Sequence, residues 1–447
     1  MIHDRITHGR GGSVQMVDHE RQDGRAQNNT GPNSLGSNFQ GMSTVKQTAG
    51  VLLLGALATL GLASDAGAQQ SDQPRDTITV GYLGLERDEE WEPLSVLDPV
   101  IDDEGVQGAR LAIDDNNAAG QFLGQEFVFV EVIMPREGDV EEGLQELLDQ
   151  GAEWIVSGLP REGLEALMEI PALEDRVVFN AAAPDNVLRG EACHPNLFHT
   201  TPSRRMLADA LAQFLGYKQW DRWALVFGNT DEDRLLAEAL GEAAQRFGQE
   251  VVGEKMWPHD PMSRRAEGGF HAIQREIPVF VQDFADHDVL VIADENDYFG
   301  EYFPYQTWLP RPVAGTQGLK ATAWHRAHES WGGVQLQRRF EEQADRWMTP
   351  RDFAAWLAVR SLGESSARTD SVARDEVLNY MLSDEFELAG YLGLPVSFRT
   401  WNHQLRQPIL ITGPRMVASV SPQEGYLHPR TPLDSLGADE GESQCRF

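Results

Sequence analysis

The sequence predicts an α/β protein whose chain forms two Rossmann-like lobes, each built around a parallel β-sheet. Short apolar runs alternate with segments of helical periodicity from residue 77 to residue 168. Alternation of strand and helix is typical of parallel sheets with covering helices. The same alternation restarts at residue 223 and continues to residue 293. Helical segments and further apolar runs then follow, which predicts that the chain returns to the first lobe before it ends.

The first lobe is predicted to begin with an apolar strand at residues 77–85. A helix is expected over 105–120, because apolar residues recur along one side and Asn116, Asn117 and Gly120 end it. The same criteria predict strands at 127–133, 154–156 and 177–179, and helices at 140–148 and 164–168.

Residues 177–228 lead from the first lobe to the second. The helix in this passage can be capped by Thr201 or Ser203, with Pro202 in its first turn. Strands are then predicted at 223–227, 251–255 and 288–293, and helices at 232–247 and 270–276. Residues 313–323 are expected to lead back, followed by helices at 334–347, 351–362 and 371–382, strands near 395–398, 408–411 and 416–420, and a polar, loosely structured tail from Leu433.

These elements divide the chain into segments. Residues 1–41 are polar and without hydrophobic period, so we expect them to be disordered or a mis-assigned extension before a true start at Met42. Residues 42–68 have the pattern of a secretory signal peptide: Lys46, an apolar stretch too short to span a membrane, and a small-residue cleavage site. Lobe 1 is predicted to comprise residues 69–200 and 321–405; lobe 2 comprises 201–320 and, with the tail, 406–447.

The formal net charge of −33 argues against binding to nucleic acid or to an anionic membrane. The signal peptide predicts an exported protein, free in the periplasm and without stable membrane insertion. Isolated cysteine pairs in oxidising compartments are usually bridged. We therefore expect a disulfide between Cys193 and Cys445 that pins the tail beside the passage between the lobes, two unpaired thiols being the alternative.

Several stretches resemble a known family. GVQGARLAIDDNNAAGQFLGQEFVFVEVIM at 105–134, GAEWIVSGLP at 151–160 and CHPNLFHTTPSRRMLADALAQFL at 193–215 resemble type I periplasmic binding proteins of the branched-chain amino-acid branch. RDFAAWLAVRSLGE at 351–364 resembles that family's long helix beside the cleft. The resemblance implies two lobes, joined by a three-crossover hinge, that close on a small ligand and present it to the permease of an ABC transporter.

A narrower resemblance concerns TAWH at 322–325 and FRTWNHQLRQPILI at 398–411. These are similar to a subgroup of ABC-transporter substrate-binding proteins that accompany pyrroloquinoline-quinone (PQQ)-dependent alcohol dehydrogenases, which implies a link to alcohol oxidation. The sequence has no Gly-x-Ser-x-Gly, no phosphate loop and no dinucleotide fingerprint. We therefore expect a binding protein, neither an enzyme nor the holder of a cofactor.

The sequence departs from this family where the ligand is held. Amino-acid binders present Ser and Thr hydroxyls from the loops after the third and fourth strands. Here those loops read Gly158-Leu159-Pro160-Arg161 and Ala181-Ala182-Ala183-Pro184, and the acid that would hold a ligand ammonium falls near the neutral Gln317. We therefore expect a small organic ligand that is not an α-amino acid.

The candidate ligand-binding residues come from both lobes. Arg161 would meet an anionic group, while aromatic side chains would stack on or enclose an apolar body. The full set is Trp91, Arg161, Ala182, Ala183, Asn229, Asp231, Asp294, Tyr298, Gln317 and Trp324.

Two alternatives keep the same fold. One is a periplasmic sensor or accessory protein whose closed form meets a signalling partner or the dehydrogenase itself. The other is a calcium- or lanthanide-binding protein, because the acid-rich segments 229–233 and 294–297 follow equivalent strands of lobe 2. Neither segment has the spacing of an EF-hand, helix capping explains the acids as well, and no metal ligands are assigned.

Overall fold

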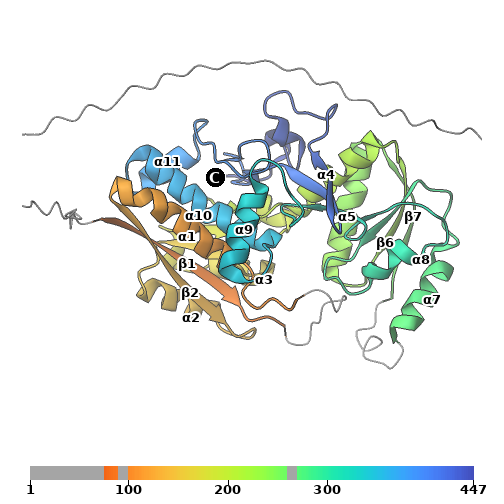
Figure 1. Ribbon diagram of the computed structural model, residues 1–447, viewed down its shortest axis with the longest axis horizontal. Helices are drawn as coiled ribbons and strands as arrows, with labels where there is room; N and C mark the ends of the chain where they lie inside the picture. The colour runs from red at the N-terminus through yellow and green to blue at the C-terminus, as the bar shows by residue number, and fades with distance from the viewer. Residues whose placement is uncertain (1–74, 89–98, 259–268) are drawn as a thin grey trace, which may run out of the picture. The chain divides into compact units, whose positions relative to one another are not determined.

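The computed structural model describes residues 75–88, 99–258 and 269–447 (Figure 1). The expectations for residues 1–41, for the signal peptide at 42–68 and for Trp91 lie outside these residues. Among the helices described, none combines the length and the apolar character needed to cross a membrane.

Lobe 1 contains a five-stranded sheet in the order β2-β1-β3-β4-β5. All neighbouring strands in it are parallel, as predicted. The strands are β1 (Asp76–Leu85), β2 (Gln125–Met134), β3 (Trp154–Ser157), β4 (Val177–Asn180) and β5 (Leu197–His199). β3 and β4 are buried throughout, as expected of parallel strands covered on both faces.

The helices of lobe 1 come from two distant parts of the chain. α1 (Val106–Leu123), α2 (Val140–Asp149), α3 (Arg161–Met168), η1 (Pro171–Leu173) and η2 (Asn186–Arg189) come first, and α9 (Gly333–Ala344), α10 (Pro350–Thr369) and α11 (Arg374–Met381) return to it. Figure 1 shows α10 beside α1. Gly108 permits this approach, because a Cβ there would overlap the backbone of Asp352. Asn116 Nδ2 donates to Val359 O at 2.8 Å across the same contact.

Lobe 2 contains a seven-stranded sheet in the order β14-β13-β10-β9-β8-β6-β7. Its strands are β6 (Arg222–Phe227), β7 (Glu250–Met256), β8 (Val289–Ala293), β9 (Val313–Gly315), β10 (Leu319–Thr322), β13 (Ile409–Gly413) and β14 (Met416–Ser421). Its helices are α4 (Arg204–Tyr217), α5 (Asp231–Arg246), α7 (Gly269–Val281), η3 (Gly300–Tyr302) and α8 (Phe303–Gln306). Ser203 caps α4, since its hydroxyl accepts from Met206 N at 3.1 Å.

The structure of lobe 2 differs in two details from the simplest form of these expectations. Residues 313–323 do not simply lead back to lobe 1, because β9 and β10 extend the lobe 2 sheet first. The sheet is also not wholly parallel: β13 is antiparallel to both β10 and β14. Only Pro414 and Arg415 separate β13 from β14, and so short a link permits a hairpin but no parallel crossover.

The chain passes between the two sheets after β5, after β10 and between β12 (Leu405–Arg406) and β13. β12 pairs with β11 (Ser397–Phe398) in a small separate sheet. The first and third passages, residues 199–204 and 399–407, lie side by side, and we call them the hinge. His199 N donates to His403 O at 2.9 Å, and Gln407 Nε2 donates to Thr200 O at 2.8 Å.

The C-terminal tail is ordered against the hinge, contrary to the expectation of a loose segment. It contains η4 (Pro432–Ser435) and η5 (Glu440–Glu442), and Leu433 and Leu436 are buried. The predicted disulfide between Cys193 and Cys445 is present, with 5.7 Å between the two Cα atoms. The polar composition of the tail suggested a loose segment because a large apolar face is missing. The tail is ordered instead by a covalent bond and by buried ion pairs.

Candidate ligand-binding site

The site is built from loops that follow the carboxyl ends of parallel strands, where open α/β sheets bind ligands. In lobe 1, Ser157 at the end of β3 is in register with Asn180 at the end of β4. In lobe 2, Phe227 at the end of β6 is in register with Ala293 at the end of β8. Each sheet therefore brings two strand-end loops together.

The loop after β3 has no room for a side chain at its first position. A Cβ on Gly158 would overlap the hydroxyl of Tyr82, which is buried and donates to Glu104 O at 3.1 Å. Ser157 is fully buried, and its hydroxyl accepts from Leu159 N at 3.3 Å. This loop thus presents no exposed hydroxyl.

The backbone amides of the loop after β4 are already hydrogen-bonded. Asn180 Oδ1 accepts from Ala182 N at 3.1 Å and from Ala183 N at 2.8 Å, and Asn180 Nδ2 donates to Ala183 O at 2.8 Å. Ala183 is buried and Ala182 is half-buried. These two candidates therefore shape the surface of the loop but do not offer amide donors to a ligand.

A buried ion bridge links the strand-end loops of the two lobes. Arg204, the first residue of α4, donates through Nη1 to Asp185 Oδ1 at 2.6 Å, in the loop after β4. Its Nε and Nη2 donate to the two oxygens of Glu295 at 2.6 and 2.7 Å, in the loop after β8. The side chains of Arg204, Asp185 and Glu295 are 4%, 8% and 22% exposed.

The electrostatics of this bridge follow from burial and pairing. Burial opposes the charge on Arg204, but hydrogen bonding and attraction to Glu295 and Asp185 raise its pKa overall. Burial raises the pKa of Glu295, against the opposing effect of Arg204. The candidate set omitted all three residues. One signal was available: an arginine in the first turn of a helix opposes the helix dipole and therefore needs an acidic partner.

The candidate ligand-binding residue Asp294 stabilises a turn of lobe 2 by accepting backbone hydrogen bonds. Its Oδ1 accepts from Tyr298 N at 2.8 Å, and its Oδ2 accepts from Phe299 N at 2.9 Å and Gly300 N at 2.6 Å. Asp294 is buried, and burial raises its pKa to about 6. The candidate Gln317 donates to Asp297 Oδ1, beside the half-buried candidate Tyr298, whose pKa burial raises. The structure thus brings Asp294, Tyr298 and Gln317 together in the loops that follow β8 and β9.

The loop after β6 carries the candidates Asn229 and Asp231, both exposed. Asp231 pairs with Arg234 at 2.8 Å and its side chain is 90% exposed. The buried carboxylate that follows this loop is Asp233 in the first turn of α5, whose Oδ1 accepts from Glu295 N at 2.7 Å. Asp233 therefore connects this loop to the ion bridge.

Of the remaining candidates, Arg161 lies at the end of the loop after β3 and Trp324 lies inside a core. Arg161, at the start of α3, pairs with Glu165 at 2.9 Å and is about one-third exposed. Trp324 is 1% exposed, donates to Gln337 Oε1 at 3.0 Å and stacks on Phe353 with 4.7 Å between ring centroids. Its ring belongs to the core of lobe 1, so it is not placed to stack on a ligand. Apolar side chains at strand ends are used more often for packing than for binding, and nothing local in TAWH distinguishes the two uses.

The acid-rich segments of lobe 2 adjoin, since Glu295 N donates to Asp233 Oδ1, but their carboxylates have separate partners. Their carboxylates are directed separately to Arg234, to Arg204 and to backbone amides. Within the described ranges, no group of three or more His, Cys, Asp or Glu side chains is placed to hold a metal ion.

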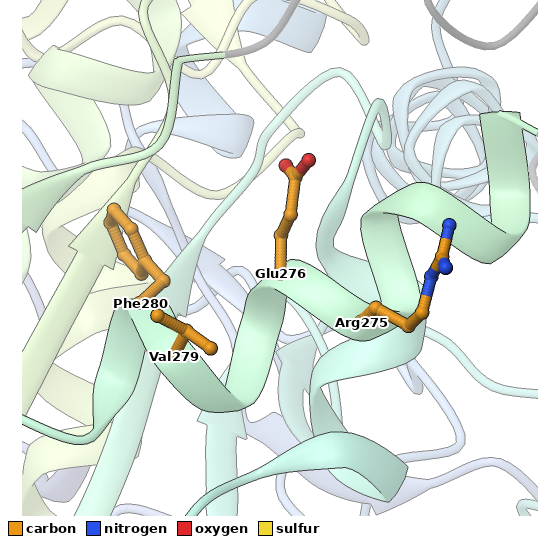
Figure 2. Close-up of a pocket in the computed structure, with 4 residues that line it drawn as sticks. All are labelled: Arg275, Glu276, Val279 and Phe280. Atoms are coloured by element: carbon orange, nitrogen blue, oxygen red, sulfur yellow. The ribbon is translucent and has the colours of Figure 1, made fainter.

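Two of the cavities in the described part of the chain have no candidate residue among the described residues that line them. One, of ≈ 510 Å³, lies along α7 and is lined by Arg275, Glu276, Val279 and Phe280. Figure 2 shows these side chains on successive turns of that helix. The other, of ≈ 350 Å³, lies between the hinge and the tail.

Comparison with known proteins identifies the fold. Residues 99–263 match the family described as periplasmic binding protein. No curated protein sequence matches the chain. A branched-chain amino-acid ABC-transporter periplasmic ligand-binding protein from Burkholderia xenovorans LB400 is similar in structure, with a TM-score of 0.62, 15% identity, and coverage of 82% of this chain and 99% of the other.

Two further solved structures show the same likeness. The leucine-, isoleucine-, valine-, threonine- and alanine-binding protein from Brucella ovis in its closed conformation has a TM-score of 0.60 at 14% identity, covering 83% of this chain and 99% of the other. The solute-binding protein of an ABC transporter from Rhodopseudomonas palustris BisB5, in complex with 3,4-dihydroxybenzoic acid, has a TM-score of 0.53 at 13% identity, covering 76% of this chain and 93% of the other. The chain therefore has the two-lobed α/β fold of the type I periplasmic binding proteins.

Proposed function

We propose that this chain is a periplasmic solute-binding protein that captures a small organic ligand between the strand-end loops of its two lobes and delivers it to an ABC-transporter permease. The observation that carries the proposal is the ion bridge from Asp185 through Arg204 to Glu295, which joins a loop of each lobe. A ligand in contact with both loops stabilises the arrangement in which the lobes approach, and this is the physical basis of hinge closure.

The proposed ligand is not a free α-amino acid. Binding the ligand carboxylate through hydroxyls requires Ser or Thr in the loops after β3 and β4, and position 158 has no room for a side chain beside Tyr82. The amides of Ala182 and Ala183 are bonded to Asn180, and the position expected to hold an ammonium group carries the neutral Gln317. The related fold from Rhodopseudomonas palustris is seen with an aromatic acid, which supports a search beyond amino acids.

A finer proposal links the ligand to PQQ-dependent alcohol oxidation. It rests on the similarity of residues 322–325 and 398–411 to the subgroup of binding proteins that accompany such dehydrogenases. The ligands to test first are therefore alcohols, aldehydes and the carboxylic acids that alcohol oxidation produces.

The test is a thermal-shift screen of residues 69–447 with leucine, valine, short alcohols, aldehydes, aliphatic acids and 3,4-dihydroxybenzoate, followed by calorimetry. A ligand at a hundredfold excess over its Kd stabilises the folded state by about 2.7 kcal/mol. We expect such a shift from a compound that lacks an α-ammonium group, and none from leucine or valine. Ala182→Glu, which places a bulky charge on the half-buried surface of the β4 loop, should abolish binding, while Glu238→Ala, on the exposed side of α5, should not. Tight binding of leucine would contradict the ligand class.

A further inference from the structure

The first part of the C-terminal tail, residues 433–447, is bound to lobe 2. Leu436 is 0% exposed and belongs to the core of lobe 2. Gly437 N donates to Asp209 Oδ2 of α4 at 2.7 Å, and the side chain of Asp209 is 1% exposed. Gly437 O accepts from Arg246 Nη1 of α5 at 3.2 Å. The start of the tail is therefore anchored to lobe 2 by buried contacts.

A second anchor to lobe 2 lies further along the tail. Glu442 Oε2 accepts from Arg205 Nη2 of α4 at 2.5 Å, and Glu442 Oε1 accepts from Arg246 Nη2 of α5 at 3.3 Å. The side chain of Glu442 is 49% exposed. Because ion pairs that are open to solvent contribute little to stability, this anchor is weaker than the one at Gly437.

The last residues of the tail are bound to lobe 1 and to the hinge. Cys445 forms the disulfide with Cys193, which lies between η2 and β5 in the sequence of lobe 1. The ring of Phe447 stacks on His403 of the hinge with 4.5 Å between ring centroids, and His403 stacks on Phe198 of β5 with 4.3 Å. The tail therefore begins on lobe 2 and ends on lobe 1.

The stretch that joins the two lobes through the tail is short. Only Ser443 and Gln444 separate Glu442, bound to lobe 2, from Cys445, bound to lobe 1. An extended chain spans at most about 3.6 Å per residue, so the three steps from Glu442 to Cys445 reach roughly 11 Å. If the ion pairs of Glu442 open, the eight steps from Gly437 to Cys445 reach roughly 29 Å. The reach of the tail therefore depends on these ion pairs.

The tail adds a fourth connection to the three passages between the sheets, and this connection is closed by a disulfide. Two lobes joined only by chain passages rotate about the hinge as rigid bodies. We propose that the tail is a strap that limits how far the lobes rotate relative to each other. The disulfide is its permanent attachment to lobe 1, and the ion pairs of Glu442 are its releasable attachment to lobe 2. The proposal rests on the hinge movement of the proposed function.

The test measures the distance between the lobes by pulsed electron paramagnetic resonance, without ligand. Nitroxide labels are attached through p-acetylphenylalanine at the exposed positions of Glu146 in α2 and Glu238 in α5, so the native cysteines stay paired. The disulfide-bonded chain should have a narrow distribution of distances. Cys193→Ser combined with Cys445→Ser should broaden it by about 1.5-fold or more, and so should reduction of the folded chain with dithiothreitol.

Two further variants separate the strap from a general effect on stability. Glu442→Gln removes the charge at the releasable attachment but keeps the disulfide, so it should broaden the distribution less than loss of the cysteine pair. Leu167→Ala is the matched control, because Leu167 is 0% exposed in the core of lobe 1 and its truncation destabilises the chain by leaving a cavity. The melting temperature of each variant is measured, and Leu167→Ala should leave the width of the distribution unchanged.

Two outcomes overturn the proposal. One is an unchanged width after loss of the disulfide, which would show that the three passages limit the rotation by themselves. The other is equal broadening in Leu167→Ala, which would trace the effect to lower stability. If the cysteine variant does not fold, the reduced chain and Glu442→Gln decide, and an unchanged width in both overturns the proposal. Failure of the strap leaves the transport function intact, and failure of the ligand screen leaves the strap intact.

Discussion

The strand-end loops and the hinge are both rich in buried charge, but they differ in how far that charge is satisfied. In the loops, Arg204 has two carboxylates to itself and Asp294 accepts three backbone N–H groups. At the hinge, Arg399 and Arg406 share Asp434, and Arg205 shares Glu442 with Arg246, which also pairs with Asp209 at 3.2 Å. The charged groups of the loops have their hydrogen-bond partners, whereas Arg399 Nη1 at the hinge has none among the described residues.

This difference teaches that charge density along a sequence is a poor guide to binding capacity. The acid-rich segments 229–233 and 294–297 suggested a cation site, yet their buried carboxylates stabilise the loops themselves. The arginines of the hinge are scattered through the sequence, and the donor that Arg399 leaves without a partner among the described residues becomes apparent only when hydrogen bonds are assigned one by one.

The largest expected effect concerns the ion bridge of the strand-end loops. Arg204→Met leaves Asp185 and Glu295 without their buried partner, so the free energy of unfolding should fall by about 3–5 kcal/mol. Urea denaturation measures the change. The triple variant with Asp185→Asn and Glu295→Gln removes the uncompensated charges and should recover part of the loss. A loss below about 1 kcal/mol, the range of exposed pairs, would show that the bridge is not buried in solution.

A smaller effect is expected at Asp294. Asp294→Ala removes the acceptor of three backbone N–H groups, so the free energy of unfolding should fall by about 3 kcal/mol. Asp231→Ala, in the other acid-rich loop, removes a carboxylate whose side chain is 90% exposed, and should change stability by no more than about 0.5 kcal/mol. Similar losses in the two variants would mean that the two loops do not differ as the structure indicates.

The smallest expected effect is a pH dependence where the tail meets α4. Asp209 Oδ2 accepts from Gly437 N at 2.7 Å, and burial raises the pKa of Asp209 from 3.8 to about 7. Since the folded state holds this proton more tightly than the unfolded chain, the stability it contributes is complete below the unfolded pKa of 3.8 and is lost as the pH rises to about 7.

The free energy of unfolding should therefore fall by at most about 1.4 kcal/mol per pH unit in that window on account of this group. Asp209→Asn keeps an oxygen for Gly437 N but cannot ionise, so it should have a shallower dependence than the unmodified chain. Denaturation at pH 5, 6 and 7 measures the difference between the two slopes. Parallel slopes would contradict the raised pKa of Asp209.

The fold was largely predictable from the sequence because its signals are local. Apolar runs such as Val289–Ala293 and amphipathic segments such as Val140–Asp149 have the periods of buried strands and of helices wherever they lie. The antiparallel pair β13–β14 was missed because strand direction depends on the link at Pro414 and Arg415 and on the neighbour that the strand finds. Trp324 was assigned to the ligand because a tryptophan after a strand has the same local pattern whether it packs or binds.

What the sequence determined by itself is therefore the α/β class, the two lobes, the cysteine pair and the lack of hydroxyls in the loops after β3 and β4. Only the tertiary structure decided which charges neutralise one another. Arg204 and Glu295 pair although they are 91 positions apart in the sequence, and Arg399 and Asp434 pair although they are 35 apart. Hydrogen bonds saturate, so the capacity that remains for a ligand depends on every partner that the fold brings to a group, and no local pattern contains that information.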